Sequence, residues 1–289
     1  MQSQGDGIYV KDWVPTKITG ASTSVQVTMR AVNPLLPEST LQLTGTLSVD
    51  NTNPVVADTG IVNAASLTSN RPVAPGSIVT IFGSDLASSG TCFGGNCADS
   101  LPLPTTLGGV SVRMGGFNAP LFFASPGQVN AQVPVELSNV TSADVVVTAR
   151  GLVSTPRTLQ IDANQPGIFV IGGSQGAVLN ENLSSNSPAR PAVRGSVIQI
   201  FATGLGPTTP AVASGAAAPS SPTASLVTPV TVTIGGINAP VQFQALAPGF
   251  VGIYQINAQV PANVAAGSAI NLKITQNGVD SNEVTVAIN

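Results

Sequence analysis

The sequence has 289 residues, enough for two domains of ordinary size, each with its own core. Hydrophobic residues make up 43% of the chain and charged residues 8%, well below the roughly 25% charged residues of average soluble proteins. Because so few residues are charged, the surface must consist mainly of neutral polar side chains. The net charge of −3 and the lack of a basic cluster exclude nucleic acid as an expected partner.

The chain begins with MQSQGDGIYV, which lacks the basic segment and the apolar stretch of a signal peptide. No apolar run reaches the ~18 to 20 residues that a membrane span needs. We therefore expect no membrane insertion, and if the protein is exported, its signal is not part of this sequence.

Two strand-like runs, 24–32 and 40–49, lie in the first part of the chain. Residues 1–58 are too few for an independent sandwich, and two such runs cannot bury both faces by themselves. We interpret this segment as a partial domain or as docking strands. The strands would pair either with the domain that follows or with a neighbouring subunit.

Three blocks of sequence then occur twice in the same order and at nearly constant spacing, which is the signature of a repeated domain. We expect an N-terminal β segment over 1–58, a first repeat over 59–163 and a second repeat over 166–289, each near the ~100 residues of an immunoglobulin-like sandwich. The second copy has extra residues around 248–254, expected to form a longer loop. The matching blocks are RPVAPGSIVTIFGSDL (71–86) with RPAVRGSVIQIFATGL (190–205), VSVRMGGFNAP (110–120) with VTVTIGGINAP (230–240), and QVNAQVP (128–134) with QINAQVP (255–261).

The blocks have the patterns of β-strands. Segments 77–82 and 196–201 are short β-branched runs, and 110–114 and 230–234 alternate apolar with polar residues. Asn277 and Gly278 form the pair typical of a hairpin turn. Helical periodicity is nearly absent, so the sequence predicts an all-β protein of two tandem immunoglobulin-like β-sandwich domains plus the N-terminal β segment. A link over 155–165 and a surface loop over 211–228 complete the expected organisation.

Six longer motifs stand out along the chain: NAAS (63–66), APGSIVTIFG (74–83), LPTTLGGVSV (103–112), PGQVNAQVP (126–134), TGLGP (203–207) and YQINAQVP (254–261). Together they resemble a C-terminal domain found at the ends of many large secreted proteins of Solibacter and other Acidobacteria. The resemblance covers about 60–289 and implies an extracellular or cell-surface setting. It also suggests similarity to the immunoglobulin-like (TIG/IPT-like) domains of transcription-factor and cell-surface proteins, but it brings no catalytic or binding residues.

The two cysteines, Cys92 and Cys97, lie close together in a segment with two glycines. Four intervening residues can fold back as a tight loop, so we expect a disulfide between them and an oxidising compartment. Two free thiols are the alternative. A zinc site is disfavoured because the chain has no His and no second Cys pair.

The absence of His also excludes Ser-His-Asp, Cys-His and His-ligated metal arrangements, and we expect no catalytic residues, no cofactor and no enzyme activity. Weak calcium candidates are Asp280, Asn282 and Glu283, together with the segment DNTN (50–53), because calcium prefers hard oxygen ligands. Their alternative role is turn chemistry, in which Asp and Asn bond their own backbone. The segment 204–207 is interpreted as a turn rather than as a phosphate loop.

The repeated Gln-x-Asn-x-Gln string places three amides on one face of a strand. This face would bind a sugar through amide hydrogen bonds, or the amides would satisfy neighbouring backbone groups, and their occurrence in both copies suits the structural role. One Trp, two Tyr and nine Phe are few aromatics for a carbohydrate-binding module.

The sequence thus predicts a non-catalytic extracellular structural or adhesive module that acts as a spacer or surface-assembly unit. The expected partner is a protein or cell-surface polymer, including a second copy of this chain. Two alternatives are a self-assembling filament or sheath subunit that uses strand addition from residues 1–58, and a carbohydrate-binding module.

Overall fold

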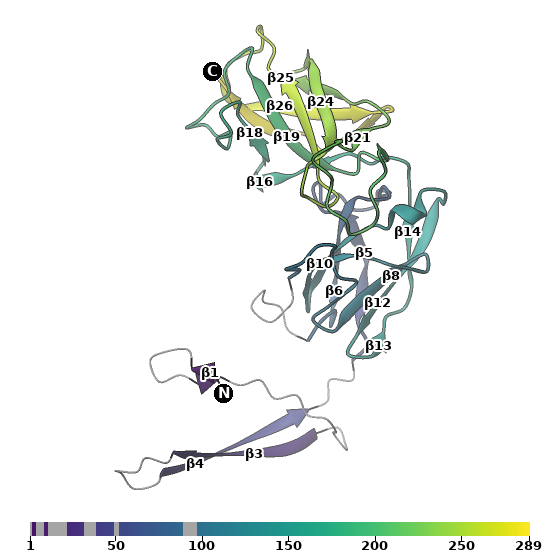
Figure 1. Cartoon of the computed structure of the whole chain (residues 1–289), viewed down its shortest axis with the longest axis vertical. Coiled ribbons are helices and arrows are strands. Elements are labelled where there is room, and N and C mark those ends of the chain that lie inside the picture. The colour runs from purple at the N-terminus through teal and green to yellow at the C-terminus, as the bar shows by residue number, and fades with distance from the viewer. Residues whose placement is uncertain (1, 4–8, 11–21, 32–38, 49–51, 89–96) are drawn as a thin grey trace. The chain divides into compact units, whose positions relative to one another are not determined.

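The computed structural model describes residues 2–3, 9–10, 22–31, 39–48, 52–88 and 97–289. These residues are almost entirely strands and turns, with one short 3-10 segment, so the protein is all-β as its sequence predicts (Figure 1). The chain divides into two compact units, Met1–Thr52 and Asn53–Asn289. Both repeats lie in the second unit.

The first unit consists of two antiparallel strand pairs. In the longer pair, ten residues of β3 face ten residues of β4, so the two strand-like runs of the sequence pair with each other. Leu41 and Leu43 are 54% and 52% exposed. Since Gln42 between them is also exposed, both faces of this part of β4 are open to solvent. The bounds are β1 (Gln2–Ser3), β2 (Tyr9–Val10), β3 (Ser22–Ala31) and β4 (Ser39–Ser48).

The first repeat is a sandwich of a four-stranded sheet, in the order β10-β11-β6-β5, and a six-stranded sheet built around β13-β12-β8-β7. Its first strand, β5, already begins at Val55, within the range expected for the N-terminal segment. The bounds are β5 (Val55–Asn63), β6 (Ile78–Ser84), β7 (Thr106–Leu107), β8 (Val110–Met114), β9 (Phe117–Asn118), β10 (Leu121–Ser125), β11 (Gln128–Gln132), η2 (Val135–Leu137), β12 (Ser142–Ala149), β13 (Leu152–Val153) and β14 (Arg157–Gln160).

The second repeat has two seven-stranded sheets, built around β15-β19-β25-β24-β21-β20 and β16-β17-β28-β26-β22-β23. Its strands β19, β25 and β24 pair in the same order as β6, β11 and β10 of the first repeat, as the matching blocks of sequence predict. The bounds are β15 (Gly167–Ile168), β16 (Val170–Gly172), β17 (Gln175–Gly176), β18 (Val178–Leu179), β19 (Val197–Thr203), β20 (Thr208–Thr209), β21 (Ser225–Leu226), β22 (Thr231–Ile234), β23 (Ile237–Ala239), β24 (Val241–Leu246), β25 (Tyr254–Gln259), β26 (Gly267–Gln276), β27 (Val279–Asp280) and β28 (Val284–Ile288).

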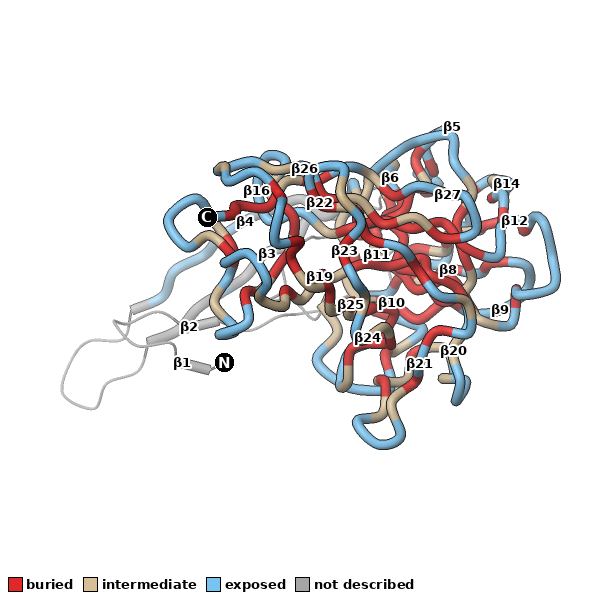
Figure 2. The backbone as a smooth tube through the Cα atoms, turned by 90° about the horizontal axis from the view of Figure 1, so that it is seen from above, coloured by how far each residue is buried: buried red, intermediate tan, exposed pale blue. Residues whose placement is uncertain are grey.

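Each sandwich has its own core, because alternate side chains of its strands point inward. In β25, Tyr254, Ile256 and Ala258 are buried, whereas Gln255 and Asn257 are half-buried on the other face. Figure 2 shows buried residues concentrated along strands such as β8, β11 and β12. The architecture is therefore two tandem immunoglobulin-like β-sandwiches plus an N-terminal β segment.

The connection that precedes the amide strand is longer in the second repeat than in the first. Strands β10 and β11 are joined by only Pro126 and Gly127, whereas β24 and β25 are joined by residues 247–253. This longer connection is the loop that the extra residues of the second copy predict. The expected surface loop 211–228 contains β21, and its first part contacts the first repeat as described below.

Deletion of a core side chain tests this assignment of faces. Ile256 is fully buried, so Ile256→Ala should lower the free energy of unfolding by about 2–5 kcal/mol, measured by urea denaturation. The matched control is Ile171→Ala, because Ile171 is 60% exposed and its truncation should change the free energy by less than about 0.5 kcal/mol. Equal losses for the two variants would contradict the fold.

Candidate functional site

The repeated amide strands β11 and β25 each end in a glutamine with a structural role. Gln132 is 5% exposed, its Nε2 donates to the carbonyl of Gly76 at 3.2 Å and its Oε1 accepts from the amide of Gly215 at 2.7 Å. At the matching position, Gln259 Nε2 donates to the carbonyl of Gly195 at 2.9 Å. In both copies this amide holds the turn that precedes the neighbouring strand, which is the structural role considered for the string.

The first two amides of each string form a pair on the outer face of the sheet. Gln128 Nε2 donates to Asn130 Oδ1 at 2.8 Å, and Gln255 Nε2 donates to Asn257 Oδ1 at 2.9 Å. All four side chains are half-buried. The same hydrogen bond in both repeats fixes the two amides relative to each other, and among the described residues their other polar atoms have no further protein partner.

Neighbouring strands place phenylalanines beside these amides. Phe201 of β19 lies opposite Gln255, and Phe243 of β24 lies opposite Asn257. In the first repeat, Phe82 of β6 and Phe123 of β10 have the corresponding positions. Directly opposite residues on antiparallel strands share a face, so each amide pair has an aromatic side chain on each neighbouring strand.

The phenylalanines beside the amide pairs were not among the site residues predicted from the sequence. Phe82 and Phe201 occupy the same position in the matching blocks 71–86 and 190–205, a signal that was present in the sequence. The register between strands, which brings Phe243 to Asn257, is decided only by the fold.

The second repeat has an apolar pocket at the end of this face, with a cavity volume of about 290 Å³. Phe201 forms one wall, and Ile253 is the last residue of the loop that leads into β25. Phe250, from the loop specific to the second copy, is 55% exposed. The full lining is Phe169, Ala177, Phe201, Phe250 and Ile253.

The junction of the two sandwiches is held by buried hydrogen bonds. The hydroxyl of Thr203, which is 0% exposed, accepts from the amide of Ile78 at 3.0 Å and donates to the carbonyl of Gly252 at 2.7 Å. Asn63 Nδ2 donates to the carbonyl of Gln165 at 3.0 Å. Since buried backbone groups need partners, these contacts fix one sandwich on the other.

Close packing at the junction also requires glycine at position 204. Gly204 has a φ of +79°, and a Cβ there would lie 2.1 Å from the carbonyl oxygen of Gln165. The amide of Gln165 donates to the carbonyl of Gly204 at 2.7 Å. The segment 204–207 thus connects β19 to β20 through closely packed backbone at the junction rather than through a regular turn.

A loop of the second repeat adds a second set of junction contacts. Ser214 Oγ accepts from the amide of Val135 at 2.9 Å and donates to Glu136 Oε2 at 2.7 Å. Gly215, besides its bond to Gln132, accepts from the amide of Leu103 at 2.8 Å. The first part of the predicted surface loop is therefore docked on the first repeat.

A cavity of about 280 Å³ lies between these two sets of contacts. Its walls are mainly apolar and include Pro75, Val135 and Leu246. The phenol of Tyr254 also lines it and donates to the carbonyl of Gly206. Burial raises the pKa of Tyr254 well above its usual range, so the phenol stays neutral and serves as a donor.

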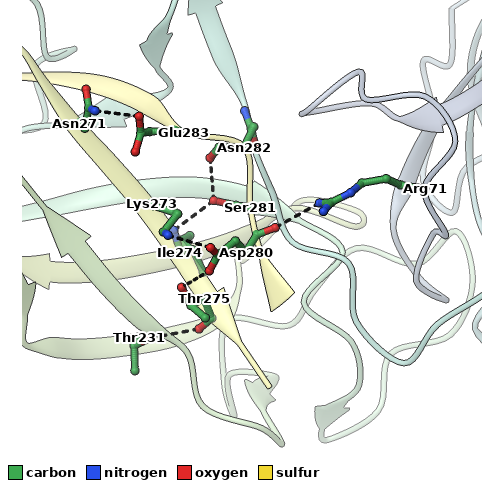
Figure 3. Close-up of polar contacts among 10 residues, drawn as sticks. All are labelled: Arg71, Thr231, Asn271, Lys273, Ile274, Thr275, Asp280, Ser281, Asn282 and Glu283. Carbon is green, nitrogen blue, oxygen red and sulfur yellow. Dashed lines mark hydrogen bonds and ion pairs between the residues drawn. The ribbon is translucent and has the colours of Figure 1, made fainter. Parts of the chain in front are cut away.

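The calcium candidate Asp280 has partners within the protein (Figure 3). Lys273 Nζ donates to Asp280 Oδ2 at 2.7 Å, and Thr275 Oγ1 donates to Oδ1 at 2.6 Å. These hydrogen bonds lower the pKa of Asp280, with the contact to Lys273 as the larger cause. The carbonyl of the same residue accepts from Arg71 of the first repeat at 3.4 Å.

The other two calcium candidates also have separate partners. Asn282 Oδ1 accepts from the amide of Ile168 at 2.8 Å, and its Nδ2 donates to the carbonyl of Ile168 at 3.0 Å. Glu283 Oε1 accepts from Asn271 Nδ2 at 2.7 Å (Figure 3). The three side chains are close in sequence, but they form three different sets of contacts rather than one common ligand set.

The remaining candidates suggested by the sequence lie partly outside the described residues. Cys92 and the first two residues of the segment 50–53 lie outside the described residues. The disulfide of Cys92 with Cys97 therefore stays a prediction. Within the ranges given above, no three Cys, Asp or Glu side chains come together in a way that would hold a metal ion. In the same ranges, none of the helical segments has the length and hydropathy needed to cross a bilayer.

No family model and no curated protein matches the chain. Among solved structures it is similar to Bacteroides ovatus SGBP-B, from a mixed-linkage glucan utilization locus, in complex with a mixed-linkage heptasaccharide (12% identity, TM-score 0.32, covering 94% of this chain and 54% of that one). It is also similar to the I9-I11 tandem of titin (10% identity, TM-score 0.20, covering 92% of this chain and 73% of that one). A further similar structure is that of domains 5-6 of the S-layer protein SbsC (14% identity, TM-score 0.26, covering 82% of this chain and 98% of that one). The chain spans about half the length of the first of these, and the scores are too low to transfer a function.

The two structural glutamines provide a test of the junction. Gln132→Leu should lower the free energy of unfolding by about 1–3 kcal/mol, because it leaves the Gly76 carbonyl and the Gly215 amide without this partner. Gln259→Leu is the matched control: Gln259 is half-buried and has one such contact, so its loss should be smaller. Chemical denaturation measures both, and a larger loss for Gln259→Leu would contradict the assignment.

Proposed function

We propose that this protein is a non-catalytic extracellular module with a structural or adhesive role, in which the two sandwiches act as one rigid spacer. The observation that supports the proposal is the buried, hydrogen-bonded junction. Bending it would separate Thr203 from Ile78 and Asn63 from Gln165, and would leave buried polar groups without partners. Tandem domains with small polar interfaces normally move against each other, so this junction restricts a motion that is otherwise expected.

The non-catalytic part of the proposal is supported by chemistry. The sequence has no His, and the phenol of Tyr254 donates its hydrogen bond to the backbone carbonyl of Gly206. The carboxylates of Asp280 and Glu283 already bind protein donors. The extracellular placement is supported by the resemblance to acidobacterial secreted proteins.

Removal of the Thr203 hydroxyl tests the rigid junction. Wild-type protein should unfold in a single calorimetric transition. Its small-angle scattering should fit one fixed arrangement of the two sandwiches. Thr203→Val keeps the side-chain shape but breaks two buried contacts, so it should cost about 1–3 kcal/mol and separate the unfolding of the two sandwiches.

The control for this experiment is Thr233→Val, at a half-buried position of β22 in the second sandwich. This variant should retain the single transition. Independent unfolding of the two sandwiches in the wild-type protein would refute the spacer. Protection of the chain from protease added to intact native cells would refute its extracellular placement.

A second candidate role, that of a self-assembling subunit, is favoured by the β3-β4 pair. An isolated two-stranded ribbon is marginally stable in water, and Leu41 and Leu43 are more than half exposed. Strand addition to another copy of the chain would pair a strand edge that has no partner among the described residues.

Deletion of residues 1–52 separates the two roles. If the β3-β4 pair mediates assembly, the wild-type protein should form oligomers in sedimentation experiments, and the truncated protein should be a monomer with unchanged melting of the two sandwiches. A wild-type monomer would refute the assembly role and leave the spacer unaffected.

A further inference from the structure

The outer face of one sheet in the second repeat combines a cavity with oriented polar groups. The apolar pocket formed by Phe201, Phe250 and their neighbours adjoins Gln255, and Asn257 follows two residues along the same strand. Adjacent strands of a sheet are about 4.8 Å apart, so the pocket and the amide pair lie within the span of one or two sugar rings. An apolar concavity with a few fixed polar groups is the usual form of a ligand site.

The amide pair is oriented before any ligand arrives. Gln255 Nε2 donates to Asn257 Oδ1 at 2.9 Å, which fixes both side chains. Among the described residues, the Oε1 atom of Gln255 and the Nδ2 atom of Asn257 have no other protein partner. One acceptor and one donor of the pair are therefore available to a ligand, which suits hydroxyl groups because a hydroxyl both donates and accepts.

The pocket supplies the complementary apolar surface. A sugar ring has hydroxyl groups around its edge and C–H bonds on its faces, so its faces pack well against aromatic rings. Phe201 and Phe250 provide such rings, and Phe243 provides another on the far side of Asn257. Phe250 and Ile253 belong to the loop that is longer in the second copy, so this loop completes a pocket whose other lining residues are Phe169, Ala177 and Phe201.

The charge of the face restricts the ligand further. None of the seven strands of this sheet contains Asp, Glu, Lys or Arg. A charged ligand would lose hydration here without gaining an opposite charge, whereas an uncharged one has no such loss.

We propose that this face of β19, β25 and β24 binds a neutral polysaccharide. One sugar ring packs in the pocket against Phe201 and Phe250, and hydroxyl groups of the same or the next ring bind Gln255 and Asn257. The chain continues along the sheet past Phe243. This site lies outside the junction and adds a binding activity to the proposed spacer.

The first repeat provides a natural comparison. It has the same amide pair, Gln128 and Asn130, and the same aromatic position at Phe82, but its loop between β10 and β11 is only Pro126 and Gly127. It therefore lacks counterparts of the loop residues Phe250 and Ile253 that complete the pocket in the second copy. Binding should be concentrated in the second repeat.

Affinity electrophoresis of the full chain tests the proposal. The gels contain barley β-glucan, xyloglucan or galactomannan as neutral polysaccharides, and polygalacturonate as a charged one. The protein should be retarded by at least one of the neutral polymers and not by polygalacturonate. Isothermal titration with the retarding polymer then gives its affinity.

Two variants in the second repeat should weaken binding by about tenfold or more: Phe250→Ala, and the double variant Gln255→Ala with Asn257→Ala. The matched controls in the first repeat are Phe82→Ala and the double variant Gln128→Ala with Asn130→Ala, which should bind like the wild type. Thermal melting checks that each variant is folded, and Phe250 is an exposed loop residue whose truncation should leave the melting temperature unchanged.

Three results would overturn the proposal. The first is the absence of retardation by all neutral polymers. The second is binding that survives both second-repeat variants or is lost with the first-repeat controls. The third is self-association of the wild type that Phe250→Ala abolishes without any polysaccharide binding, since the face would then be an interface between copies. None of these results affects the junction, so the spacer is tested separately.

Discussion

The hydroxyl of Thr203 lies between a backbone amide of the first sandwich and a backbone carbonyl of the second. Both backbone groups are removed from water, so each needs this partner to avoid an unsatisfied buried polar atom. Asn63 meets the same need for the carbonyl of Gln165, in the link between the repeats. At Gly204 the close approach of the backbone leaves no room for a side chain. The position of one sandwich on the other thus follows from the need to satisfy a few buried polar groups.

The two copies of the domain keep the same framework and differ in what they add to it. Gln132 and Gln259 hold equivalent turns, but only Gln132 also binds a loop of the other repeat. The amide pairs of β11 and β25 have the same hydrogen bond. The second copy adds the loop with Phe250, which converts a common surface into a pocket. Both copies therefore contribute to the junction, and the second copy alone adds the loop with Phe250.

The low charge of the chain has a common consequence for both regions. Contacts at the junction are mainly hydrogen bonds between neutral groups, which salt screens less than exposed ion pairs. The outer face of the sheet that contains β19, β25 and β24 offers amides and phenylalanines, and its strands contain no charged residue. A strand edge with few charged side chains has little protection against pairing with another strand, which bears on the assembly role proposed for the β3-β4 pair.

The sequence by itself determined the fold class, the duplication and the strands, because period-two alternation, turn residues and matching blocks are local signals. It also predicted the longer loop before Tyr254. Only the tertiary structure decided that Phe243 lies beside Asn257, that Ser214 and Gly215 dock on the first repeat, and that Asp280 and Glu283 have separate partners. Strand register and domain packing depend on contacts between residues far apart in the chain, and no local pattern in the sequence encodes them.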